Sequence, residues 1–112
     1  MSEINKKRVQ ALVNSLFDID QCEPEWDQAA ADAYNAMASG HREVLKQLVE
    51  TGPVWDGDVI AKSYRDDLLE WKLATRVVVR NEQGFTGATY TGWSVLKRGS
   101  EAAFVDGAKS NG

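Results

Sequence analysis

The 112-residue sequence has few of the residues that build covalent or metal-held sites. It contains one cysteine, Cys22, and one histidine, His41. A single cysteine excludes an internal disulfide, and this pair is too small a set of ligands for a structural zinc site. No orienting motif surrounds either residue, there is no phosphate-binding loop, and acidic residues alone do not indicate hydrolysis. We therefore expect a protein that is not an enzyme and that uses no cofactor or metal.

Long hydrophobic runs are also missing. No stretch approaches the roughly 18 apolar residues that a helix needs to cross a bilayer. The opening stretch, MSEINKKRVQ, is not followed by the apolar core of a signal peptide. These patterns predict a cytoplasmic protein without contact to a membrane.

Positive charge is scarce and unevenly placed. Lys and Arg total 13 against 17 Asp and Glu, which gives a net charge of −4 and argues against a protein that coats nucleic acid. Between Val9 and Gly40 there are six acidic residues and no Lys or Arg. Between Ile60 and Arg98 there are seven basic residues and four acidic ones, so the second half of the chain has the basic bias.

The first half of the chain predicts helices. Apolar residues at helical spacing favour one helix over 3–17 and an alanine-rich one over 25–39, with a Pro24-containing linker at 18–25. Gly40 is placed to end the second helix. A third helix is expected over 41–51.

In the second half of the chain the spacing of apolar residues changes from a helical to a strand-like pattern. A short helix is expected from Asp56 to Lys62, and Ser63 is the expected N-cap of a further helix that runs to about Lys72. Three consecutive valines favour a strand over 73–80, and NEQG is the expected tip of a hairpin that returns over 85–93. The stretch 91–98 is compatible with either a longer strand or a helical turn.

The order of these elements resembles a winged helix-turn-helix. The residues that carry the resemblance are REVLKQLVETG, GDVIAKS, RDDLLEWKLATRVVV and GFTGATYTGW, within about 42–98. It implies a mainly α fold with a β-hairpin, in which two extra N-terminal helices precede the winged unit. One domain is expected over 1–112, with a helical pair at 3–39, a winged-helix unit at 41–98 and a flexible tail at 99–112.

The resemblance also implies a core and shows one departure. Leu68, Leu69 and Leu73 would pack against Val44, Leu48 and Ile60. Many members have glycine just before the leucine that ends the recognition helix, whereas this chain has Lys72 there. The character of the chain is similar to that of small phage and prophage proteins.

By this resemblance, the first residues of the second helix would contact DNA. Arg65 would read guanine, and Ser63 or Tyr64 would bind phosphate. Further cations would form a phosphate-contacting rim or remain solvated surface charges: Lys62, Arg76, Arg80, Lys97 and Arg98. Strand alternation predicts that Arg76 and Arg80 share one sheet face.

Two aspartates oppose DNA contact by this helix. Asp66 and Asp67 would repel phosphate, and we interpret them as acids that stabilise the first helical turn by about 0.3–1 kcal/mol each. His41 is expected at the surface or as a cap. Trp55 and Trp71 are expected in the core, and Phe85 is the best candidate for an exposed aromatic that contacts a partner.

Two functions remain open from sequence. The first is a small DNA-binding transcriptional regulator that binds double-stranded DNA, with a phage origin and a homodimeric state as further expectations. The second is a winged-helix adaptor or inhibitor that meets a basic, nucleic-acid-handling protein through an acidic surface. The acidic residues expected to contact that partner are Asp18, Asp20, Glu23, Glu25 and Asp27.

Overall fold

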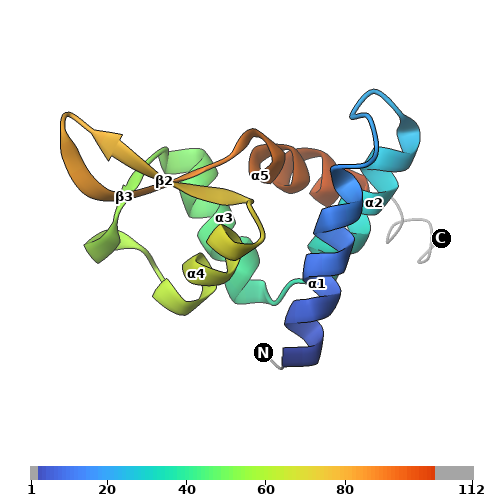
Figure 1. Ribbon diagram of the computed structural model, residues 1–112, viewed down its shortest axis with the longest axis horizontal. Coiled ribbons are helices and arrows are strands. Elements are labelled where there is room, and N and C mark those ends of the chain that lie inside the picture. The colour runs from blue at the N-terminus through green and yellow to red at the C-terminus, as the bar shows by residue number, and fades with distance from the viewer. Residues whose placement is uncertain (1–2, 103–112) are drawn as a thin grey trace. The chain divides into compact units, whose positions relative to one another are not determined.

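The computed structural model describes residues 3–102, and the side chains from residue 5 onward. The chain is mainly helical with a small three-stranded antiparallel sheet (Figure 1). It divides into two compact units, one of which is Ser39–Trp93 and the other the residues before and after it. The expected split had instead assigned 41–98 to one unit. None of the helices in the described range has the length and apolar character needed to cross a membrane.

The first unit is built from helices. They are α1 (Glu3–Leu16), α2 (Pro24–Ala36) and the π-helical segment η2 (Val95–Gly99), which continues from α5 (Tyr90–Ser94). Pro24 occupies the start of α2, where its missing N–H has no partner in any case. The core of this unit includes Val13, Trp26 and Val95, all buried. The residues left open at 91–98 are therefore helical, as are the described residues 100–102 of the expected tail, and residues 103–112 lie outside the described range.

The second unit begins earlier than expected. Helix α3 (Ser39–Thr51) includes Gly40 in its first turn, whereas α2 ends at Ala36 and is capped by Met37. The prediction that Gly40 ends the second helix was wrong. A side chain at Gly40 would overlap the ring of Tyr64, so glycine is required here for close packing.

A strand and an extended segment replace the predicted short helix. Residues Val54–Trp55 form strand β1, and only Asp56–Asp58 are helical, as a single 3₁₀ turn called η1. The chain then runs extended into α4 (Lys62–Glu70), whose N-cap is Ala61 with no side-chain cap hydrogen bond. Ser63 is therefore not the N-cap. Ile60, expected in the core, is 62% exposed because the extended backbone turns Val59 inward in its place.

Helix α4 ends in a Schellman motif, in which backbone N–H groups bond back across the last turn. The Leu73 N–H donates to the Leu68 carbonyl at 3.0 Å, and the Lys72 N–H donates to the Leu69 carbonyl at 3.1 Å. Lys72 takes the left-handed conformation, with φ of 62°. The departure noted in the sequence thus puts a lysine at the position that favours glycine.

The sheet has the order β1–β3–β2, with β2 (Ala74–Val79) and β3 (Glu82–Ala88) forming the predicted hairpin (Figure 1). Its turn is the two-residue Arg80–Asn81, both with positive φ, which indicates a type I′ turn. The expected NEQG tip is shifted, and Gly84 instead lies in a bulge of β3, where two residues face Val78.

Candidate functional site

An arginine–aspartate network joins η1, α4 and β2. The Asp56 carboxylate accepts from Arg76 through both of its oxygens, at 2.7 and 2.8 Å, and from Arg65 at 3.0 Å. Arg76 also donates to the Thr86 hydroxyl at 2.9 Å. The carboxylate of Asp66 accepts two further bonds from Arg65, at 2.8 and 3.0 Å. Two guanidinium groups are thus held by two carboxylates.

The network shifts the pKa of two of its members. Hydrogen bonds from Arg76, and then the positive charges of Arg76, Arg65 and Lys62, hold the pKa of Asp56 below its ordinary value. The hydrogen bonds to Asp56 in turn raise the pKa of Arg76. The Arg65 side chain is 13% exposed and the Arg76 side chain 47%. The two guanidinium groups and the two carboxylates of the network therefore cancel in charge.

The sheet carries an apolar row on one face. Trp55 pairs with Phe85, and Phe85 pairs with Val77 on its other side, so the three side chains lie on the same face. The Trp55 and Phe85 rings contact each other with centroids 5.4 Å apart. Trp55 is 46% exposed, which corrects the expectation that it lies in the core. Phe85, expected to be the exposed aromatic, is half-buried, as is Val77. We call Trp55, Phe85 and Val77 the apolar row.

A glycine holds the tryptophan of the apolar row in place. A side chain at Gly84 would come within 2.5 Å of the Trp55 ring, and Gly84 has a φ of 97°, which favours glycine. The indole therefore lies across the β3 bulge. Such a fixed, partly exposed tryptophan resembles the aromatic anchors found at the centres of protein interfaces.

A buried pair joins α3 to α4. His41 is fully buried, and its Nε2 lies 2.8 Å from the Asp67 carboxylate. The imidazole also contacts the rings of Tyr64 and Trp71, each with centroids 4.7 Å apart. The expectation of a surface His41 was wrong. So was the helix-dipole interpretation of the aspartates, because the first turn of α4 contains no acidic residue.

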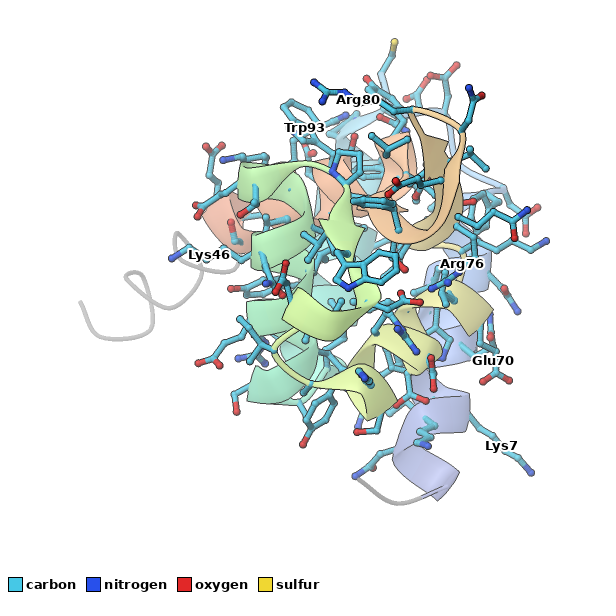
Figure 2. The ribbon with its side chains drawn as sticks, turned by 90° about the vertical axis from the view of Figure 1, so that its left-hand side faces the viewer. Lys7, Lys46, Glu70, Arg76, Arg80 and Trp93 are labelled. Carbon is cyan, nitrogen blue, oxygen red and sulfur yellow. The ribbon has the colours of Figure 1, made fainter. Side chains whose placement is uncertain are left out.

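The remaining predicted DNA contacts in this unit differ in exposure and in the element that carries them. Lys62 and Ser63 are exposed at the start of α4, whereas Tyr64 is half-buried against α3. Arg80 lies in the hairpin turn, beyond the end of β2, so strand alternation does not extend to it. Figure 2 shows Arg76 and Arg80 at separate places on the hairpin, and the predicted shared face is not formed.

The other two predicted DNA contacts belong to the first unit. Lys97 is exposed, whereas Arg98 lies over the Trp26 ring at 4.6 Å. Arg98 donates to the Asp27 carboxylate at 2.8 Å and to the Gln21 carbonyl at 2.6 Å. Arg98, a predicted DNA contact, and Asp27, a predicted partner contact, thus neutralise each other within the unit.

The other acidic residues lie around the α1–α2 connection. Asp20 accepts from the Cys22 N–H at 2.9 Å, and this bond lowers the pKa of Asp20. The exposed acids of this stretch are Asp18, Asp20, Glu23 and Glu25. The stretch is therefore a negative surface of the first unit.

Within the described range, no three residues of the metal-ligating types lie together in a group that could hold an ion. Comparison of the chain with protein-family models, curated proteins and solved structures finds no significant match. A function for the chain is therefore inferred from the geometry of its own residues.

Sequence reasoning missed the two residues that organise this region. Asp56 was expected to cap a short helix, and Trp55 was expected in the core. The signal that could have found them is the Val54–Trp55 pair, which directly follows Gly52 and Pro53 and is long enough for one short strand.

Proposed function

We propose that the chain is a winged-helix protein that binds another protein and does not read DNA through α4. The winged-helix arrangement is supported by the strand order β1–β3–β2 and by the hairpin that follows α4 in the chain and turns at Arg80–Asn81. The role is one of binding, without catalysis or a cofactor.

The observation that carries the proposal is that the Arg65 side chain is ion-paired and largely buried. Its guanidinium bonds to Asp56 and Asp66, and its side chain is 13% exposed. To read a guanine edge, Arg65 would have to leave both carboxylates, and these would then face the phosphates. A neutral, partly apolar surface suits a protein interface better, because charged residues are depleted and aromatic residues and arginine enriched at interface cores.

The apolar row and the acidic stretch indicate the kind of partner. Trp55 and Phe85 supply an aromatic anchor in the second unit. The chain has a net charge of −4, and Asp18, Asp20 and Glu23 lie exposed in the first unit. A basic protein, such as one that itself handles nucleic acid, is the partner that this charge would attract.

A second candidate function is a DNA-binding regulator. The observation in its favour is that Lys62, Ser63 and Arg80 are exposed around α4 and the hairpin. These residues would supply phosphate contacts, and a dimer would be needed for specificity.

One experiment separates the two functions. Retention of a random-sequence duplex DNA is measured at low salt for the wild type, for Arg65→Ala and for Asp56→Asn. We expect no retention by the wild type or by Arg65→Ala. Asp56→Asn should gain retention that falls steeply with salt, because it removes one carboxylate of the network and leaves the Arg76 guanidinium without its ion pair, while Arg65 keeps Asp66.

The contrary outcome is equally clear. If the wild type is retained and Arg65→Ala releases the DNA, α4 reads DNA and the proposal is wrong. If Asp56→Asn is retained no better than the wild type, the neutralising role of Asp56 is wrong.

A further inference from the structure

Strand β2 lies at an edge of the sheet. The order is β1–β3–β2, so β2 pairs with β3 on one side and with no other strand of the described residues on the other. The backbone groups along such an edge form a template that can pair with another extended chain.

The edge carries few of the features that usually prevent such pairing. Its sequence, ATRVVV, contains no Pro, Gly, Lys or acidic residue, and ends in three β-branched valines. The bulge of the hairpin lies on β3 instead. Val78 is 62% exposed. This strand therefore has a high preference for pairing and weak protection against it.

The one charged residue of the strand is already neutralised. Arg76 makes a two-oxygen ion pair with Asp56, at 2.7 and 2.8 Å. Two copies of the chain, each with a net charge of −4, would repel each other at most approaches. A neutral edge adds no local charge repulsion of its own when two such copies meet.

From these observations we infer that two copies of the chain associate by antiparallel pairing of their β2 strands, which joins their sheets into one six-stranded sheet. The strand is its own complement under two-fold symmetry. Centred on Val77, the pairing puts Arg76 of one copy opposite Val78 of the other and Thr75 opposite Val79. No like charges face each other in this register. The inference goes beyond the binding of a different protein proposed above and does not depend on it.

The test is sedimentation equilibrium of the full chain over a range of concentrations, under reducing conditions because Cys22 is exposed. We expect a reversible dimer. Val78→Lys should weaken it about tenfold, since a lysine on an edge strand opposes pairing with another strand. Ile60→Lys is the matched control, because Ile60 has the same 62% exposure.

Amide hydrogen exchange gives a second readout that needs no variant. Amides of β2 should become more protected as the wild-type concentration rises, whereas amides of α1 should not change. A wild type that is monomeric up to about 1 mM would overturn the inference. So would an equal effect of Val78→Lys and Ile60→Lys. None of these results bears on DNA retention, so the two proposals fail separately.

Discussion

The two sides of α4 use neighbouring carboxylates differently. On one side Asp67 is buried and bonds to His41 of α3, among aromatic rings. On the other side Asp66 is 62% exposed and shares the Arg65 guanidinium with Asp56. The first carboxylate links two helices, and the second reduces the charge of a surface. In a DNA-binding protein this helix would present cations to the DNA. Here, instead, each side of α4 carries an aspartate that is engaged in a contact within the protein.

The largest expected effect is on the buried side. Asp67→Ala should lower the free energy of unfolding by about 3 kcal/mol, because it removes one partner of a buried pair. Asp66→Ala is the control one residue away, and should change that free energy by less than about 0.5 kcal/mol. Urea unfolding followed by circular dichroism measures both. Equal losses of unfolding free energy in the two variants would contradict the difference inferred between the two sides of α4.

The apolar row gives the next effect. Gly84→Ala should lower the free energy of unfolding by about 2 kcal/mol, since it combines backbone strain with displacement of the Trp55 ring. Gly52 has a similar φ of 82°, but a side chain there would meet nothing within 4 Å. Gly52→Ala should therefore show the backbone strain alone, about 1 kcal/mol. If the two losses measured in urea are the same, Trp55 is not held by the bulge.

A smaller effect, of opposite sign, is expected at the end of α4. Lys72→Gly should raise the free energy of unfolding by about 1 kcal/mol, because it relieves a left-handed lysine in the Schellman motif. Lys46→Gly, inside α3, should lower that free energy by about the same amount. Thermal unfolding of the two variants checks the signs. Destabilisation by Lys72→Gly would contradict the left-handed conformation.

The smallest effect concerns pH. The pKa of Asp56 is below its ordinary value of 3.8 in the folded chain, so its ion pair stabilises the fold above that value. This contribution disappears as the pH falls through the lowered pKa. The difference in unfolding free energy between wild type and Asp56→Asn should be present at neutral pH and vanish in strong acid. A difference in unfolding free energy that grows as the pH falls would contradict the predicted direction of this pH dependence.

Local sequence patterns were enough to predict the elements in which apolar residues recur at helical spacing or form a continuous run. The helical periodicity of Val44, Leu45 and Leu48 predicted α3, and the valine run of 77–79 predicted β2. The hairpin that the valine run implied is present, with Val77 paired to Phe85. These features depend on neighbours in the sequence, which is why sequence analysis finds them.

The site could not be predicted in the same way, because it depends on contacts between distant residues. Asp56 and Arg76 are twenty positions apart, and His41 and Asp67 twenty-six. The composition of 60–98 indicated a basic surface, yet Asp56 lies just outside that window and folds back onto two of its arginines. Charge counted along the chain therefore overstated the charge available to a ligand.

Whether α4 contacts DNA is measured most directly by an NMR titration of the wild type with random-sequence duplex DNA at low salt. We expect that the backbone amides of Ser63–Asp67 do not shift, since Arg65 stays with Asp56 and Asp66. Saturable shifts concentrated in these five amides would contradict this expectation, and would make α4 a DNA-contacting helix.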